Sequence, residues 1–283
     1  MKQPLTIILF LFLSISAGAT RRALIIGIGD YPQETGWKKI NGDKDIPLVE
    51  ETLTANGFQT ANIVTLCNRQ ATCSAIKKEL ESIISKSQQG DYIYIHFSGH
   101  GQQITDLNGD EEDGFDEAWI TYDAQYAYAK GKYEGQNHLV DDQLNQYLHR
   151  LREKIGANGK IIVIADACHS GGGSRAEDDE DCVVRGTADA FIIPNSQISK
   201  SNINYPVQWI FVSACNSNQN NYEYNGNGSL TYILHSSLHE LNKKTLSQLN
   251  DIIRKFYKDP YKFRRTQTPL FEYPIGAEND IFL

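Results

Sequence analysis

The sequence predicts an α/β domain in which helices cover both faces of a largely parallel sheet. Apolar runs that suit buried strands alternate along the chain with segments whose apolar residues recur at helical spacing. Hydrophobic residues make up 40% and charged residues 22% of the 283 positions, as is ordinary for a soluble globular protein. Because no internal repeat or linker divides the chain, a single domain is expected.

Five apolar runs are expected to form the strands of the sheet. The first run is continuous and closes on glycine, which is typical of a strand buried on both faces. The third begins at Tyr92 and runs into the sequence Ser98-Gly99-His100-Gly101. The predicted strands cover residues 22–31, 62–67, 92–98, 160–168 and 207–215, and a short extended segment covers 269–274.

Helical spacing and boundary residues predict five helices. The first has Pro47 near its first turn and Gly57 past its end, the positions at which helices favour these residues. A later helix is expected to be capped by Asp141 or Asp142. The predicted helices cover residues 45–56, 72–87, a segment from 141 or 142 through 151, 230–241 and 245–257.

Two connecting segments are longer than a compact domain usually needs. Residues 105–114 form an acidic, glycine-containing loop, and a short hairpin is expected to follow it up to Tyr133. Residues 171–204, after the fourth strand, are long and polar. Loops of this length are usually functional or mobile.

The first residues are typical of an export signal. Lys2 supplies the positive start, residues 5–15 are apolar, and Ala17-Gly18-Ala19 fits a small-residue cleavage site. We therefore expect a signal peptide over 1–19 and a secreted or periplasmic mature domain over 20–283, with an uncleaved anchor as the alternative. The apolar run is too short to predict a stable membrane span.

Charge and cysteine content limit the partners and the redox state. A formal net charge of −8 argues against nucleic-acid binding through a basic face and allows cationic substrates or metal ions. An odd count of five cysteines leaves at least one thiol unpaired in an exported chain. Cys67 and Cys73 are close enough in sequence to bridge a turn, and Cys168 is the candidate free thiol.

His100 and Cys168 stand where two predicted strands end, each next to glycines. Open parallel sheets bind ligands beyond the carboxyl ends of their strands. A cysteine nucleophile needs a base, usually histidine, and the backbone N–H groups of Gly101 and Cys168 are suited to bind an oxyanion. The pair predicts acyl transfer, most simply peptide-bond hydrolysis; the alternative is a buried thiol and a structural histidine.

The two strand ends carry the motifs HFSGHG and DACHSGG, which resemble the catalytic motifs of caspase-like cysteine peptidases and of metacaspases in particular. The stretches RALIIGIGDY, GDEEDGFDE, LVDDQL and FVSACNSNQ resemble further metacaspase blocks in the same order. Because no long insertion separates the halves, the chain looks most like the type I group. The resemblance implies a three-layer α/β/α sandwich with a mostly parallel central sheet and a Cys168–His100 dyad.

The metacaspase resemblance also implies an acidic substrate pocket formed by Asp45 and Asp166, with Ser98 beside them. A carboxylate pair holds an arginine guanidinium in a planar fork, or a lysine ammonium as a point charge. We therefore expect polypeptide substrates with Arg or Lys before the cleaved bond. The alternatives are helix capping for Asp45 and a structural acceptor of loop amides for Asp166.

Residues 106–117 hold seven acids in twelve positions, a density that a cation would relieve. Hard oxygen ligands favour Ca²⁺. We reject an EF-hand, since glycine is misplaced and no helix precedes the loop. The resemblance implies calcium ligands at Asp116, Asp141 and Asp142, with Asp178 as a guess for the fourth; the alternative is a solvated acidic loop with a helix cap.

Arg185 lies in the long segment after Cys168. If the pocket binds arginine, the chain is expected to cut itself after Arg185; the alternative is an ordinary surface arginine.

Other functional readings are weaker. His235 and His239 have the spacing of a zinc pair, but serine stands where a zinc protease needs glutamate, and GIGDY lacks the glycine fingerprint of a dinucleotide site. A monomeric, calcium-activated cysteine endopeptidase is the leading hypothesis. The alternatives are a clan peptidase with legumain-like or clostripain-like preference and a catalytically silent binding module.

Overall fold

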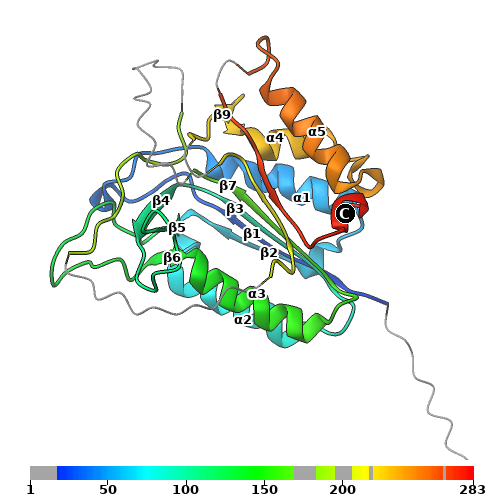
Figure 1. Cartoon of the computed structure of the whole chain (residues 1–283), viewed down its shortest axis with the longest axis horizontal. Helices are drawn as coiled ribbons and strands as arrows, with labels where there is room; N and C mark the ends of the chain where they lie inside the picture. The colour runs from blue at the N-terminus through cyan, green and yellow to red at the C-terminus, as the bar shows by residue number, and fades with distance from the viewer. Residues whose placement is uncertain (1–17, 169–182, 195–205, 217–218, 264–265) are drawn as a thin grey trace, which may run out of the picture.

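The central sheet of the computed structural model confirms the expected α/β architecture (Figure 1). Its six strands have the order β11-β8-β7-β3-β1-β2; five run parallel, and β11 runs antiparallel to β8. The strands are β1 (Arg21–Gly27), β2 (Ile63–Cys67), β3 (Tyr92–Ser98), β7 (Lys160–Asp166), β8 (Ile210–Ser213) and β11 (Leu270–Glu272). The structure describes residues 18–168, 183–194, 206–216, 219–263 and 266–283.

Helices pack on both faces of this sheet, which makes the predicted three-layer sandwich (Figure 1). One face carries α2 (Cys73–Lys86) and α3 (Asp141–Ile155). The other face carries α1 (Asp45–Ala55), α4 (Ser229–Ser236) and α5 (Leu246–Tyr257). None of the helices in the described part of the chain is long and apolar enough to cross a membrane.

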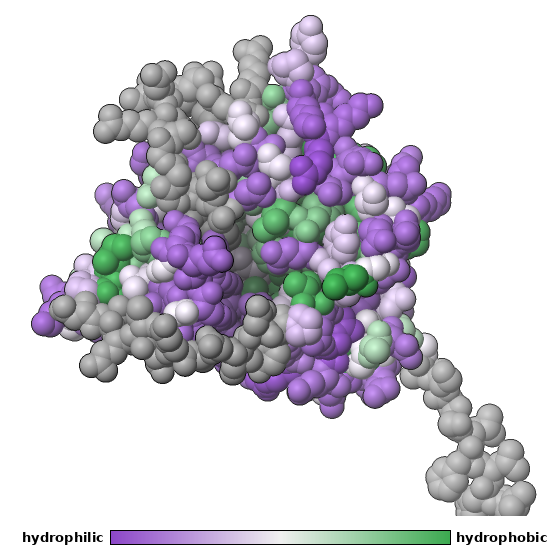
Figure 2. All heavy atoms as spheres, viewed as in Figure 1, coloured by the Kyte–Doolittle hydropathy of each residue, from purple (hydrophilic) through white to green (hydrophobic). Residues whose placement is uncertain are grey.

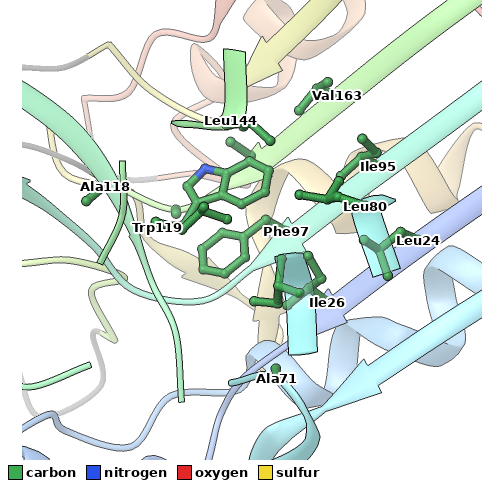
Figure 3. Packing of buried hydrophobic residues seen from close by; sticks show 14 of the residues in the cluster. Leu24, Ile26, Ala71, Leu80, Ile95, Phe97, Ala118, Trp119, Leu144 and Val163 are labelled. Carbon is green, nitrogen blue, oxygen red and sulfur yellow. The ribbon is translucent and has the colours of Figure 1, made fainter. Parts of the chain in front are cut away.

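The core under α2 and α3 fixes the strand that leads to His100. Phe97 of β3 stacks on Trp119, with ring centroids 4.6 Å apart and planes 4° from parallel (Figure 3). Leu80 of α2 and Leu144 of α3 belong to the same cluster. Each such side chain contributes about 1.5–3 kcal/mol through burial, so the end of β3 before His100 is held firmly.

Few large apolar side chains are exposed among the described residues, as the composition leads one to expect. The face in Figure 2 is mostly hydrophilic, with smaller groups of apolar residues between the polar ones. Among the described residues, the exposed large apolar side chains are Leu107, Ile192, Val207, Tyr261, Ile275 and Ile281.

A second, antiparallel sheet replaces the hairpin expected before Tyr133. It has the order β4-β5-β6, formed by β4 (Gly101–Thr105), β5 (Phe115–Ile120) and β6 (His138–Val140). The main strands of the hairpin are not where they were predicted, because β5 pairs back onto β4 around the acidic loop itself; at Tyr133 a single antiparallel bridge to Ala129 is formed. The acidic loop is therefore the turn of a hairpin whose first strand begins directly after His100.

Two helices are capped by the first residue of their predicted range, and the one cap that was predicted is wrong. The side chain of Thr72 caps α2, and Thr245 caps α5 in a capping box. The prediction that Asp141 or Asp142 caps α3 is wrong: the N-cap is Val140, and both acids lie in the first turn. Their carboxylates lie near the acids of the β4–β5 loop instead, as described below.

The bridge that the spacing of Cys67 and Cys73 allows is absent, since neither cysteine forms a disulfide. Cys67 ends β2, and Cys73 opens α2 with its side chain buried. Burial raises the pKa of both thiols. Both cysteines are therefore poorly reactive thiols at neutral pH.

Two short strands and six short 3-10 turns complete the described structure. The strands β9 (Glu223–Tyr224) and β10 (Asn227–Gly228) pair antiparallel across a turn in which Asn225 and Gly226 have φ of 51° and 73°. Positive φ at both central residues is typical of a type I′ hairpin turn. The 3-10 turns are Gln33–Thr35, Gly42–Lys44, Thr60–Asn62, Asn68–Gln70, Leu241–Lys243 and Ala277–Asn279.

His138→Gln should make stability less sensitive to acid. Burial lowers the pKa of His138 to about 4, from about 6.5 in the unfolded chain. Its stabilising effect is therefore present above pH 6.5 and is lost as the pH falls towards 4. Between pH 7 and pH 5 the wild type should lose about 2 kcal/mol more unfolding free energy than the variant, measured by urea denaturation. Equal losses would show that folding does not lower the pKa of His138.

Candidate active site

The register of the central sheet places His100 and Cys168 at the same edge. Strands β3 and β7 are parallel neighbours, and their last residues, Ser98 and Asp166, pair directly. His100 and Cys168 follow two residues later on adjacent strands. The structure thus brings the candidate base and the candidate nucleophile to the carboxyl ends of neighbouring strands.

The ring of His100 is held in one tautomer. Its Nε2 lies 2.8 Å from the carbonyl oxygen of Lys38, which can only accept, so Nε2 carries the proton. Its Nδ1 is buried and has no hydrogen-bond partner among the described residues. The ring stacks on Trp37, with centroids 4.9 Å apart. Burial lowers the pKa of His100 to about 4, so at pH 7 the ring is neutral and Nδ1 holds a free lone pair.

Cys168 lies fully buried beside a second thiol. Its Sγ donates to the carbonyl oxygen of Gln219 at 2.7 Å, and the thiol of Cys215 reaches the same oxygen at 3.3 Å. A hydrogen bond with Cys168, together with burial, raises the pKa of Cys215 well above its usual value. Cys215 therefore stays a protonated thiol next to the candidate nucleophile.

The peptide bond between Arg185 and Gly186 lies between the two candidate catalytic residues. The N–H of Cys168 donates to the carbonyl oxygen of Arg185 at 2.8 Å. On one side Gly186 forms a bridge with Gly101. On the other, a Cβ on Gly186 would lie 2.9 Å from the Cβ of Cys168, so only glycine allows this approach. One of the two predicted oxyanion donors thus already binds a carbonyl oxygen.

The side chain of Arg185 fills the predicted acidic pocket. Its Nη1 lies 2.6 Å from Asp45 Oδ2, 2.7 Å from Ser98 Oγ and 3.9 Å from Asp166 Oδ1. All three predicted pocket residues therefore converge on one guanidinium. Because Arg185 is completely buried, the alternative of an ordinary surface arginine is wrong.

The start of α4 holds the two pocket aspartates in place. Asp45 Oδ1 accepts from the N–H of Gly228, the N-cap of α4, at 3.0 Å. Asp166 Oδ2 accepts from the N–H and the hydroxyl of Thr231, each at 2.7 Å. Asp166 therefore also has the structural role that was its alternative, as an acceptor of hydrogen bonds. The side chain of Asp45 does not cap α1, its own helix, and instead accepts a hydrogen bond from the start of α4. The positive end of the α4 dipole stabilises both carboxylates.

The pocket has an excess of negative charge. Burial alone would lower the pKa of Arg185, but the carboxylates of Asp45, Asp166 and Glu223 outweigh burial and raise it. The side chains of these acids are 1%, 0% and 4% exposed. Burial raises the pKa of Asp166 despite the opposing effect of Arg185. Such a site strongly favours a bound cation over an empty or neutral one.

Glu223, the third acid of the pocket, was not predicted from the sequence. Its Oε1 accepts from Nε of Arg185 at 3.1 Å and from the N–H of Asn41 at 2.7 Å. Glu223 stands in β9, directly opposite Gly228 in the hairpin register. The Asn225-Gly226 pair, a common hairpin signal, was the feature of the sequence that pointed to this turn.

Residues 221–223 bind the main chain of residues 183–185 as an antiparallel strand. The N–H of Arg185 donates to Asn221 O at 2.9 Å, and the N–H of Glu223 donates to Val183 O at 3.0 Å. Between them, Val184 and Tyr222 form an antiparallel bridge. Peptides that add a strand to an exposed edge are bound through this pattern of main-chain bonds.

The acidic loop between β4 and β5 gathers carboxylates. Those of Asp106, Asp110 and Asp116 lie within 4.8 Å of one another. Burial and the charges of Asp142 and Asp106 raise the pKa of Asp116 to about 8. Oxygen ligands 2.3–2.6 Å from a Ca²⁺ ion lie at most about 5 Å apart, so this donor set fits calcium. From the sequence, Asp106 and Asp110 were considered as ligands only in the rejected EF-hand reading, because composition alone does not show which acids converge.

The structure does not bring the predicted calcium ligands into one group: Asp116 belongs to the first group, Asp141 to a second, and Asp142, whose carboxylate bonds the side chain of Asn108, to neither. Asp141 lies with Glu111 and Glu117, whose carboxylates are also within 4.8 Å of one another. Burial, followed by the charge of Glu117, raises the pKa of Asp141 well above its usual range. Asp178 lies outside the described residues.

Comparison with known proteins identifies the family of the domain. The model of the family described as Caspase domain matches residues 20–275. Metacaspase-1A of Aspergillus fumigatus is 32% identical over 160 residues, which are 53% of this chain and 35% of that protein. Metacaspase-1 of Emericella nidulans is 32% identical over 160 residues, 53% of this chain and 36% of that protein. The match thus spans about a third of the length of these relatives.

A crystal structure of a Geobacter sulfurreducens protein shares the fold. It superposes with a TM-score of 0.65 at 21% identity, covering 93% of this chain and 97% of that one. Together with the family match over residues 20–275, the comparisons show that this chain belongs to the caspase-domain family of cysteine peptidases and is similar within it to the metacaspases.

Proposed function

We propose that the protein is an exported, calcium-activated cysteine endopeptidase that cleaves polypeptides after arginine or lysine and cuts its own chain after Arg185. One observation carries the proposal: Arg185 fills the acidic pocket while the N–H of Cys168 binds its carbonyl oxygen at 2.8 Å. This arrangement supports cleavage after a basic residue, since binding of the cationic side chain in the pocket places the following peptide bond beside the thiol of Cys168.

In the proposed reaction, Nδ1 of His100 takes the proton of the Cys168 thiol, and the sulfur attacks the carbonyl carbon of Arg185. The thiol now donates to Gln219, so its proton must first turn towards His100. The N–H groups of Cys168 and Gly101 stabilise the oxyanion. The C–N bond then breaks, and His100 returns the proton to the amine of Gly186. Water hydrolyses the thioester and restores the thiol.

Substrates from other chains would bind in place of residues 183–185. Their main chain would pair with residues 221–223, and their basic side chain would enter between Asp45, Asp166 and Glu223. A neutral side chain would leave three buried carboxylates without a cation, at a large energetic cost. A legumain-like preference for a neutral residue is therefore disfavoured. The free lone pair on His100 likewise disfavours a silent binding module.

Calcium activation is supported by the position of the acidic loop. Asp106, Asp110, Asp116 and Asp142 would hold the ion, which would supply positive charge against their mutual repulsion. The acidic loop follows β4 directly, and the first residue of β4, Gly101, is the neighbour of His100 in the chain. The N–H of Thr105 in β4 donates to Phe191 O at 3.1 Å, so ordering the loop would also order the segment after the cut site.

Export is proposed from the leader-like residues 1–19, which precede the matched domain. The mature protein would have a net charge of −9, since Lys2 leaves with the leader.

Self-cutting should require Cys168 and Arg185. Wild-type protein incubated with Ca²⁺ should yield fragments with a break between Arg185 and Gly186, read by intact-mass spectrometry and N-terminal analysis. Cys168→Ala and Arg185→Gln should stay whole at that bond. Arg150→Gln is the matched control, because Arg150 pairs with Glu81 on the surface and its loss should leave the cut unchanged. A cut after Arg185 in purified Cys168→Ala would mean that another protease makes it.

Removing two acids of the loop should weaken calcium activation. The Asp116→Asn/Asp142→Asn double variant should need at least about tenfold more Ca²⁺ for half-maximal cleavage of an arginine peptide, because it loses two charged ligands. Asp251→Asn removes an exposed acid on α5 and should leave the calcium dependence unchanged. Wild-type activity that persists in chelator would contradict the calcium proposal and leave the peptidase proposal standing.

A further inference from the structure

We propose that Glu223 makes the pocket select arginine over lysine, by bonding the inner side-chain nitrogen that only arginine has. The proposal rests on the proposed function, since it takes bound Arg185 as the guide to how a substrate arginine binds.

The pocket contacts the two ends of the guanidinium with different acids. The outer nitrogen Nη1 meets Asp45 at 2.6 Å and Ser98 at 2.7 Å. The inner nitrogen Nε meets only Glu223, at 3.1 Å, among the hydrogen bonds of the described residues. Asp45 and Glu223 thus bond different N–H groups of one planar cation, which fixes its orientation as well as its charge.

A lysine in this pocket would make only part of these contacts. Its last methylene would stand where arginine has Nε, and its ammonium would stand near the central guanidinium carbon. Asp45 and Asp166 could still attract that ammonium as a point charge. Glu223 would face a methylene, and a buried carboxylate without its bonded cation is costly.

Glu223 cannot easily move towards the ammonium group of a bound lysine, because its carboxylate is fixed by hydrogen bonds to Asn41. Oε1 accepts from the N–H of Asn41 at 2.7 Å, and Oε2 bonds the side-chain amide of Asn41. The side chain is only 4% exposed. The tight Asn225-Gly226 turn fixes the strand from which Glu223 projects. The acceptor is therefore preorganised at the position of an arginine Nε.

The main chain of Glu223 has a separate task, which makes the side chain testable alone. Its N–H donates to Val183 O, a bond that any bound peptide would make whatever its basic residue. Substituting the side chain leaves this bond in place. The change should therefore act on the choice between arginine and lysine, not on peptide binding in general.

The test compares two peptides that differ only in Arg or Lys before the cleaved bond, with kcat/KM measured for wild type and for Glu223→Gln. The wild type should prefer arginine by at least about tenfold. The variant should lose about tenfold or more on the arginine peptide and less than about threefold on the lysine peptide, since only the arginine bond loses its charged partner. The arginine-to-lysine ratio does not depend on how much of the protein is folded and active.

Glu278→Gln, an exposed acid near the C-terminus, is the matched control and should keep the wild-type ratio. If Glu223→Gln yields no active protein, Asn41→Ala is the second test. This variant removes the side-chain amide that bonds Oε2 of Glu223, and it should also lower the arginine-to-lysine ratio of kcat/KM. An unchanged ratio in the active variant overturns the inference alone. A wild type that cleaves neither peptide overturns the proposed function instead.

Discussion

The buried ion pair between Arg185 and Asp45 is the interaction on which the rest of the site depends. A guanidinium with no exposed surface is stable only if its charge is compensated by bonded carboxylates. Three acids compensate it here, which leaves the pocket negative even when it is filled. Removing Arg185 would therefore leave buried carboxylates that bind another cation strongly. The ion pairs that stabilise Arg185 in the uncut chain would therefore bind the basic side chain of a substrate in the cut enzyme.

Distant elements converge to build this pocket. The N-terminus of α4 fixes Asp45 and Asp166, and the β9–β10 hairpin presents Glu223 from a third direction. The adjacent ends of β3 and β7 carry His100 and Cys168 at the same level. Because residues 183–185 pair with the strand beside Glu223, the side chain and the main chain of Arg185 are bound together. Both sets of bonds place one carbonyl beside the thiol.

The sequence predicted the parts of the site that local patterns reveal. Apolar runs that close on glycine marked the strand ends at His100 and Cys168, and the metacaspase resemblance pointed to Asp45, Asp166 and Ser98. Glu223 was missed because its partners, Asn41 and Arg185, lie 182 and 38 residues away. The acidic loop was recognised, but its hairpin was misplaced, since strand pairing depends on long-range register and not on composition. The alternative of an exposed Arg185 failed for the same reason: burial of an arginine depends on tertiary contacts.

The most direct test asks whether Arg185 occupies the site that substrates use. Binding of a fluorescent tripeptide ending in arginine amide would be measured by anisotropy to Cys168→Ala and to Cys168→Ala/Arg185→Ala, neither of which can cut. If Arg185 fills the substrate pocket, the double variant should bind the peptide at least about tenfold more tightly, because its pocket is free. Equal affinity in the two proteins would mean that substrates bind elsewhere, and it would contradict the central claim.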